Sequence, residues 1–316
     1  MVIVNTPAPA PFRFGIEMLG PFPGMTWADS VRELEATGYS TVFVPDHFDE
    51  GYGPVAAMAA AATATTSLVV ASAVLAADFR HPAVLARELS TIDALSGGRL
   101  EVGLGAGYQV NDYRVSGVPM AEPGVRVDRL FEQVRILRGL FQAGDRPFSF
   151  EGEHYAIDDL VLLPRPHRPA GPPILIAGGG KRMLRFAAKH ADIIGINPRL
   201  PTSTRRDPRD GLAELVDEKL GWIRESAGDR IADLVFHCWV RYALVTDDGT
   251  TAAAELARAL GIEAKAVRES PFVLIGSVSE IVERLHQRRE RWGYSYFTVQ
   301  QERAREFAPV LAALAA

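Results

Sequence analysis

The chain has 316 residues, 47% of them hydrophobic, and a net charge of −5. This length is enough for one large α/β domain or two smaller ones, while the mild acidity excludes the basic footprint of a nucleic-acid-binding protein. The single cysteine, Cys238, excludes an internal disulfide framework and is interpreted as an inert thiol of a buried strand. Because neither a signal peptide nor an apolar run of membrane-spanning length is found, we expect a cytoplasmic protein without membrane contact.

Strands and helices alternate after an extended lead-in over residues 1–11. Apolar runs predict eight strands, over residues 12–17, 41–44, 68–75, 100–104, 173–177, 192–196, 234–244 and 294–299. Apolar residues at helical spacing predict helices over residues 27–37, 54–66, 122–141 and 181–190, from Pro82, from Ser277 and after the last strand. This order indicates a single (β/α)8 TIM barrel over residues 1–316, in preference to a doubly wound open sheet.

Three segments interrupt the pattern and are predicted insertions, near residues 105–121, 145–171 and 197–210. The second contains a predicted hairpin over residues 148–163. The third is rich in arginine, with Arg199, Arg205, Arg206 and Arg209. We interpret it as a solvated loop after the sixth strand, and a lid or a clamp for an anionic ligand is the alternative.

Glycines follow the fourth and fifth predicted strands. Gly105–Gly107 leave bare backbone at one strand end, and Gly178–Gly180 lead into a helix that begins with Lys181 and Arg182. Free N–H groups at a helix N-terminus attract anions, and the helix dipole disfavours basic residues there. We therefore infer one phosphate group held between the two loops, with two ordinary strand-end turns as the alternative.

His47 is the candidate for proton transfer. It follows the second strand between Asp46 and Asp49, two acids that could orient it, and histidine suits proton transfer near neutral pH. A surface-loop histidine is the alternative. No set of His, Asp and Glu has convincing metal spacing, so no bound metal is expected. The histidines interpreted as structural are His81, His154 and His190.

These features resemble the bacterial luciferase-like family, the group of flavin monooxygenases and coenzyme F420-dependent oxidoreductases. The resemblance runs from Phe12 to about Val299 and is carried by Thr41–Phe48, by the stretch from Arg87 to Gly107, and by Pro173–Gly180. It implies a (β/α)8 barrel with an insertion, usually dimeric. It also implies a cofactor ring in the barrel mouth, with the cofactor phosphate at the loops after strands four and five.

The resemblance assigns roles to individual residues. An Asp-His pair ends strand two in the deazaflavin branch, so Asp46 is expected to contact the cofactor and His47 to face the reacting carbon as proton donor or acceptor. A non-proline cis peptide bond is expected at Ala73–Val74. The other cofactor-binding positions are expected at Ala73, Val74, Ala76, Gly105, Ala106, Gly107, Asn111, Gly178, Gly179, Gly180, Arg182 and Met183.

Two further residues are catalytic candidates. Tyr108 stands where sugar-phosphate dehydrogenase members have a glutamate, which disfavours glucose-6-phosphate chemistry and makes Tyr108 a proton donor or a cavity wall. Glu17 is a further polar group expected near the ring. Aromatic side chains that could line a substrate cavity are Phe22, Trp27, Phe48, Tyr52, Phe79 and Tyr108.

Three functions are compatible with this sequence. The favoured one is hydride transfer between coenzyme F420 and a small organic substrate, with the acidic tail of the cofactor near Arg199, Arg205 or Arg206. The second is an FMN-dependent two-component monooxygenase, which needs oxygen access. The third is a non-catalytic flavin-binding barrel. A homodimer is expected, and a separate reductase is expected to supply reduced F420 or FMN to either enzyme.

Overall fold

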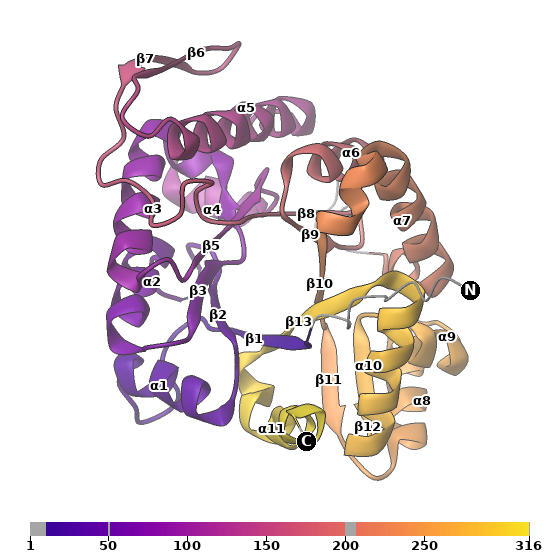
Figure 1. The fold of residues 1–316 in the computed structure, drawn as a ribbon. Coiled ribbons are helices and arrows are strands. Elements are labelled where there is room, and N and C mark those ends of the chain that lie inside the picture. The colour runs from indigo at the N-terminus through magenta and orange to yellow at the C-terminus, as the bar shows by residue number, and fades with distance from the viewer. Residues whose placement is uncertain (1–10, 50, 200–206, 316) are drawn as a thin grey trace, which may run out of the picture.

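The computed structural model describes residues 11–49, 51–199 and 207–315. Within them, a closed parallel β-barrel is surrounded by helices (Figure 1). The barrel strands are β1 (Arg13–Glu17), β2 (Thr41–Val44), β3 (Val69–Ser72), β4 (Leu75–Ala76), β5 (Leu100–Gly105), β8 (Ile174–Gly178), β9 (Ile193–Ile196), β10 (Val235–Trp239) and β13 (Tyr294–Gln300). Their order is β3-β2-β1-β13-β10-β9-β8-β5-β4, and β3 also pairs with β5, which closes the sheet. In the described part of the chain, the barrel has eight strand positions, one of which is shared by two short strands, β3 and β4. The predicted (β/α)8 fold is confirmed.

One of the eight strand positions of the barrel is occupied by two short strands, β3 and β4. β3 pairs with β2 and with the start of β5, whereas β4 pairs with the end of β5, where Leu75 lies opposite Leu104. Between β3 and β4, a cis peptide bond joins Ala73 to Val74. The cis bond expected from the family resemblance is therefore confirmed, and it divides the strand that was predicted over residues 68–75.

Helices cover the outside of the barrel between the strands. They are α1 (Trp27–Thr37), α2 (Pro54–Ala64), α3 (Pro82–Ser96), α5 (Pro123–Gln142), α6 (Lys181–His190), α7 (Ala213–Ala227), α10 (Val278–Trp292) and α11 (Ala304–Ala315). The Thr26 side chain accepts from the Asp29 N–H at 3.1 Å, and Ser277 and Glu280 form a reciprocal capping box. Local capping therefore sets the starts of α1 and α10, as predicted.

Shorter elements fill the segments between the βα units. The segment after β5 contains α4 (Val110–Ser116). The predicted hairpin forms from β6 (Phe148–Glu151) and β7 (Ala156–Leu160) and stands away from the barrel beyond α5 (Figure 1). Within the described residues, no helix is both long enough and apolar enough to cross a membrane.

The predicted strand over residues 234–244 is wrong in its second half. β10 ends at Trp239, and β11 (Tyr242–Val245) leaves the barrel to pair in parallel with β12 (Val273–Gly276). The backbone changes partner because the N–H groups of Arg241 and Tyr242 both donate to the Phe272 carbonyl. Helices α8 (Gly249–Leu260) and α9 (Ala264–Glu269) pack on this small sheet. Helices cover both β10 and β11, so both segments are apolar. Hydrophobicity alone therefore does not show where the chain leaves the barrel sheet.

A polar network closes the amino-terminal end of the barrel. Arg13 donates to Glu101 at 2.7 Å, and its guanidinium lies 4.0 Å from the centre of the Tyr296 ring. The Tyr296 hydroxyl lies 2.9 Å from Glu101 Oε2 and 2.7 Å from Thr41 Oγ1. Above this layer, Phe43 packs among apolar side chains inside the barrel. The barrel interior is therefore filled at this end.

Candidate active site

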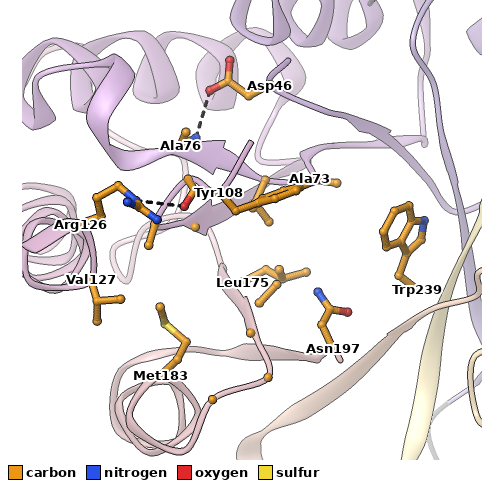
Figure 2. A pocket seen from close by; sticks show the side chains of 18 of the residues that line it. Asp46, Ala73, Ala76, Tyr108, Arg126, Val127, Leu175, Met183, Asn197 and Trp239 are labelled. Atoms are coloured by element: carbon orange, nitrogen blue, oxygen red, sulfur yellow. Dashed lines mark hydrogen bonds between the residues drawn. The ribbon is translucent and has the colours of Figure 1, made fainter. Parts of the chain in front are cut away.

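A cavity of about 390 Å³ opens at the carboxyl ends of the barrel strands, where a (β/α)8 fold carries its chemistry. Figure 2 shows Arg126 and Val127 at one side of it and Trp239 at the other. The predicted site residues that line it are Glu17, Asp46, His47, Ala73, Val74, Ala76, Gly105, Ala106, Gly107, Tyr108, Gly178, Gly179, Gly180, Arg182 and Met183. All predicted site residues lie within the described ranges, and of these Asn111 alone is not part of the lining. It lies on α4, where its side-chain oxygen accepts from Arg114.

His47 and Asp112 form a hydrogen-bonded pair at the cavity wall. His47 lies in the loop after β2, Asp112 lies on α4, and Nδ1 of the histidine is 2.7 Å from Oδ2 of the aspartate. The other Asp112 oxygen accepts from the Phe48 N–H at 3.0 Å. Because a carboxylate only accepts hydrogen bonds, this contact places a proton on Nδ1 and leaves Nε2 for a ligand.

Asp46 does not orient His47, contrary to the prediction. Its Oδ2 accepts from the Ala76 N–H at 3.0 Å (Figure 2), and Arg80 binds both carboxylate oxygens, at 2.6 and 3.0 Å. Asp49 is also engaged elsewhere, because Gln109 donates to it at 2.7 Å. Asp46 and Asp49, the acids near His47 in the sequence, therefore hold neighbouring loops in place. A contact between Asp46 and a cofactor stays a prediction.

The same region brings three potential metal-ligand atoms together. Suitable atoms of His47, Asp49 and Asp112 lie within 4.8 Å of one another. Hydrogen bonds already engage each group, since His47 bonds to Asp112 and Asp49 accepts from Gln109. The hydrogen bonds explain this grouping, and the expectation that no metal is bound stays a prediction.

The glycines at the end of β5 and just after it allow a close approach of neighbouring side chains. A Cβ on Gly105 would lie 2.6 Å from Val74 Cγ2. A Cβ on Gly107, whose φ is +72°, would lie 2.1 Å from the Tyr113 hydroxyl. Packing within the chain therefore explains why these positions are glycine, as the ordinary-turn interpretation requires, although their backbone also lines the cavity.

The glycines after β8 combine close packing with an open helix N-terminus. A Cβ on Gly179 would lie 2.4 Å from the Asn197 carbonyl oxygen and 2.6 Å from the Arg199 nitrogen. Gly180 is the N-cap of α6, has no side-chain cap, and would place a Cβ in open space. Backbone N–H groups at the start of α6 are thus accessible from the cavity, and this arrangement suits a phosphate group.

Neighbouring side chains engage the basic residues at the start of α6. Arg182 forms an ion pair with Asp128 of α5, and Lys181 lies 5.6 Å from the centre of the Trp222 ring of α7. These contacts explain why basic residues occur at this helix start, so their charge is not an argument for a phosphate. The open N-terminus of α6 carries the phosphate hypothesis instead.

Arg126 is a cation at the cavity that sequence reasoning missed. It lies on α5, is 8% exposed, and donates from Nε to the Gly107 carbonyl at 3.3 Å and from Nη1 to the Ala121 carbonyl. Arg126 lies in the first turn of the helix predicted over residues 122–141, directly after the first insertion. This position near the strand ends could have identified Arg126 as a cavity residue. Arg126 supports the first glycine loop and adds positive charge beside it.

His237 is a second lining residue that sequence reasoning missed. Its Nε2 lies 2.7 Å from Thr298 Oγ1, and burial, followed by the charge of Arg13, lowers the pKa of His237 to about 3. The imidazole is therefore neutral at physiological pH and serves as a hydrogen-bonding wall. Strand alternation could have found it, because His237 and Trp239 line the cavity while Cys238, between them, packs in the outer core.

Cys238 has the environment of an inert thiol. Its Sγ donates to the Pro271 carbonyl at 3.3 Å. Burial raises the pKa of Cys238 to about 12, so the thiol stays protonated at neutral pH. The geometry agrees with the interpretation of Cys238 as a core residue.

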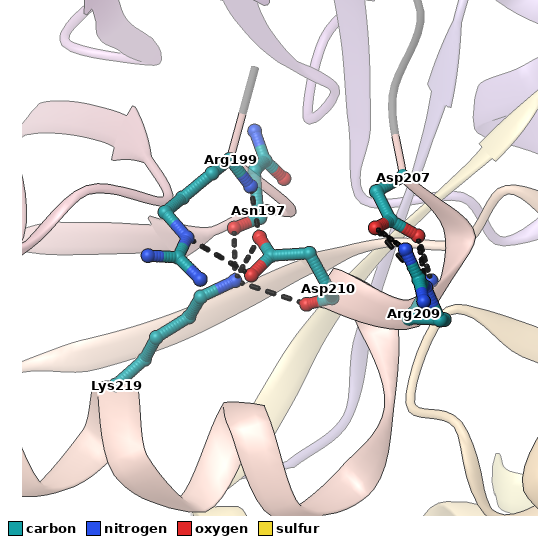
Figure 3. Close-up of polar contacts among 6 residues, drawn as sticks. All are labelled: Asn197, Arg199, Asp207, Arg209, Asp210 and Lys219. Carbon is teal, nitrogen blue, oxygen red and sulfur yellow. Dashed lines mark hydrogen bonds and ion pairs between the residues drawn. The ribbon is translucent and has the colours of Figure 1, made fainter. Parts of the chain in front are cut away.

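Asp210 fixes the chain that follows β9. Figure 3 shows it between Arg199, whose Nε lies at 3.0 Å, and Lys219, whose Nζ lies at 2.8 Å. Lys219 is 1% exposed and also donates to the Asn197 carbonyl at 2.9 Å. Because Asn197 lines the cavity, this ion pair holds one edge of the site.

The described part of the arginine-rich segment favours a structural role over a clamp. Arg209 pairs with Asp207 at 2.8 Å, and Arg199 is held by Asp210 (Figure 3). Arg205 and Arg206 lie outside the described residues. The charges of the described arginines are thus engaged within the chain.

Comparisons with known proteins agree with this geometry. The family model of the luciferase-like monooxygenases matches residues 26–268. An F420-dependent glucose-6-phosphate dehydrogenase of Amycolatopsis mediterranei is 31% identical over 189 residues, 57% of this chain and 55% of the relative. The pyrimidine monooxygenase RutA of Cronobacter turicensis is 34% identical over 168 residues, 52% of this chain and 42% of the relative. The chain spans about half the length of the curated relatives it matches.

Solved structures share the fold over nearly the whole chain. An F420-dependent secondary alcohol dehydrogenase in complex with an F420-acetone adduct superposes with a TM-score of 0.74 at 19% identity, over 96% of this chain and 99% of that one. The long-chain alkane monooxygenase LadA superposes with a TM-score of 0.74 at 15% identity, over 97% and 91%. The family match covers most of the chain, and the chain therefore belongs to the luciferase-like monooxygenase family of oxidoreductases.

Proposed function

We propose that this protein is a coenzyme F420-dependent oxidoreductase that transfers a hydride between C5 of the deazaflavin and a small organic substrate. The observation that carries the proposal is the His47–Asp112 pair, which presents a histidine of defined proton position at the wall of a cavity. Relatives named as F420-dependent dehydrogenases support the choice of cofactor.

The residues around the cavity fit such a cofactor. The open N-terminus of α6 at Gly180 would hold its phosphate, with Gly179 keeping the turn against the chain after β9. Ala73, Val74 and Leu175 offer apolar surface for a ring. The bound deazaflavin supplies the hydride chemistry, so the protein has to position its ring and manage a proton.

His47 would manage that proton. If an alcohol were oxidised here, Nε2 of His47 would accept the proton from its hydroxyl, and the hydride from its carbon would go to the bound deazaflavin. The imidazolium that results is stabilised by the Asp112 carboxylate 2.7 Å from Nδ1. When a carbonyl is reduced, both transfers run in reverse.

Tyr108 and Glu17 would have supporting roles. The Tyr108 ring meets the His47 ring edge-on, with centroids 5.9 Å apart, and is 40% exposed. This placement favours a wall beside the reacting carbon. Glu17, at the end of β1, would contribute a polar group near the ring.

A two-component FMN monooxygenase is the second candidate, because RutA is among the relatives of this chain. The non-catalytic flavin-binding barrel is the third candidate, and it gains no support from the buried Asp112 beside His47. The homodimer and the separate reductase stay predictions.

Parallel titrations of the purified protein with F420 and FMN, followed by fluorescence, test the proposal. We expect tight F420 binding and weak FMN binding. Preference for FMN would replace the proposal by the monooxygenase, and binding of neither would favour the non-catalytic barrel. A Gly221→Ala variant is the control for handling, since Gly221 of α7 is exposed and a Cβ added there would meet no other atom within 4 Å.

A further inference from the structure

Aromatic side chains gather beside His47 at the cavity mouth. Phe79 lines the cavity, and its ring meets the Phe48 ring edge-on with centroids 5.2 Å apart. Phe48 itself lies outside the lining, and its backbone N–H donates to Asp112 at 3.0 Å. Tyr108 also lines the cavity, meets the His47 ring edge-on and is 40% exposed. These rings are fixed in place while their surfaces stay open, which is how a preformed apolar binding wall is built.

The opposite side of the cavity is aromatic as well. Trp239 lies across the cavity from Arg126 (Figure 2). Of the other predicted aromatic residues, Tyr52 packs against Trp27 with ring centroids 5.6 Å apart, and Phe22 is buried in the core. The aromatic wall is thus concentrated around His47 and across from it.

Positive charge at the cavity is already engaged. Among the described lining residues, the arginine and lysine side chains are Arg126 and Arg182. Arg126 donates to two backbone carbonyls, and Arg182 pairs with Asp128. An anionic substrate that recruited Arg182 would first break the Arg182–Asp128 ion pair, whereas Arg126 has its Nε and Nη1 donors committed to backbone carbonyls at the first glycine loop.

Negative charge, in contrast, lies next to His47. Asp112 is 2.7 Å from its Nδ1, and Asp49 belongs to the same cluster within 4.8 Å. Glu17 also lines the cavity. An anionic group beside His47 would therefore lie in a region where Asp112 and Glu17 of the lining, and Asp49 close to it, contribute negative charge, and such like-charge proximity is unfavourable.

Resting on the proposed function, we propose that the substrate is an uncharged, largely apolar alcohol or ketone and not a sugar phosphate. In the reductive direction the carbonyl carbon gains a hydride from reduced F420 and the oxygen gains a proton from His47. The products are the alcohol and oxidised F420. The named activity of the glucose-6-phosphate dehydrogenase relatives then does not extend to this chain.

A matched pair of probes tests this substrate class. Acetophenone and para-acetylbenzoate differ in one carboxylate, and each is offered with reduced F420, beside glucose 6-phosphate with oxidised F420. We expect kcat/KM for acetophenone to exceed that for the carboxylate by about tenfold or more, with no turnover of the sugar phosphate. Equal or faster turnover of the carboxylate, or turnover of glucose 6-phosphate, would overturn the inference.

Two variants link the preference to the wall. Tyr108→Ala is expected to raise KM for acetophenone about tenfold with a smaller change in kcat, because an exposed aromatic ring of the cavity lining is removed. Tyr242→Ala is the aromatic control, since Tyr242 of β11 is 38% exposed and lies outside the cavity lining. An equal effect of both variants would argue against the wall.

Calorimetric binding of the two ketones separates this inference from the proposed function. We expect acetophenone to bind more tightly than the carboxylate, both with and without cofactor. If F420 does not bind but acetophenone still binds more tightly than the carboxylate, the proposed function is wrong and the inference of an apolar binding wall is retained. If F420 binds but the carboxylate binds as tightly as acetophenone, or if neither ketone binds, the inference fails alone.

Discussion

The two ends of the barrel interior use polar groups in different ways. At the amino-terminal end, Arg13, Glu101 and Tyr296 bond to one another in a closed network. At the carboxyl end, Asp112 fixes one nitrogen of His47 and leaves the other for a ligand. The comparison teaches that a polar residue inside a barrel indicates function when part of its hydrogen-bonding capacity faces a cavity, and structure when its neighbours use all of it.

The largest expected effect on stability lies at the closed end. Glu101→Leu removes the carboxylate that pairs with Arg13, and the two side chains are 8% and 30% exposed. The partly buried guanidinium of Arg13 is then left without its ion-pair partner. This loss is expected to lower the free energy of unfolding by about 3 kcal/mol, while cofactor affinity stays unchanged. Urea denaturation measures the loss. Glu290→Leu, at an exposed position of α10, should change stability much less, and equal losses would contradict the closed network.

The second prediction concerns the open end. In Gly179→Ala the new methyl group would lie 2.4 Å from the Asn197 carbonyl oxygen, so the turn before α6 must shift. We expect F420 affinity to fall about 30-fold, close to 2 kcal/mol, because the helix N-terminus is displaced from the phosphate. Fluorescence titration measures it. Affinity equal to that of Gly221→Ala would place the phosphate elsewhere.

Asp112→Asn should separate orientation from binding. The amide replaces the carboxylate opposite Nδ1 of His47 and no longer stabilises an imidazolium. Turnover is expected to fall about 10-fold or more and its pH profile to shift, with F420 affinity retained. A turnover rate and pH profile like those of the wild type would contradict the positioning role.

The last prediction concerns the pH dependence of stability. Burial lowers the pKa of His237 to about 3 in the folded protein, whereas an unfolded histidine titrates near about 6.5. As pH falls below that value, the unfolded state takes up a proton that the folded state refuses, so stability decreases by about 2 kcal/mol between pH 7 and pH 5. Denaturation at both pH values should show that His237→Asn loses less stability than the wild type. His286→Asn, at an exposed position, should behave like the wild type.

The features that sequence could predict are those encoded locally. The alternation of apolar strands and helices identified the barrel, and capping residues such as Thr26 and Ser277 fixed helix starts. Fifteen of the positions proposed as site residues line the cavity because parallel strands deliver their carboxyl ends to one face. His47 was found in this way.

The features that sequence missed depend on contacts between distant segments. Asp112 meets His47 across 65 positions, and Arg80 meets Asp46 across 34. A residue's sequence neighbours do not reveal such partners, so Asp112 was not identified as the residue that orients His47. The departure of β11 from the barrel was missed for the same reason, since its partner β12 lies far along the chain.

The role of His47 is tested most directly by single-turnover hydride transfer in the His47→Ala variant. The protein is saturated with reduced F420, mixed with acetophenone, and followed by the return of the oxidised cofactor absorbance. We expect F420 affinity within about twofold of the wild type and a transfer rate lower by about 100-fold or more, since proton transfer to the carbonyl oxygen is lost. A variant that binds F420 and transfers hydride at the wild-type rate would contradict the central role of His47.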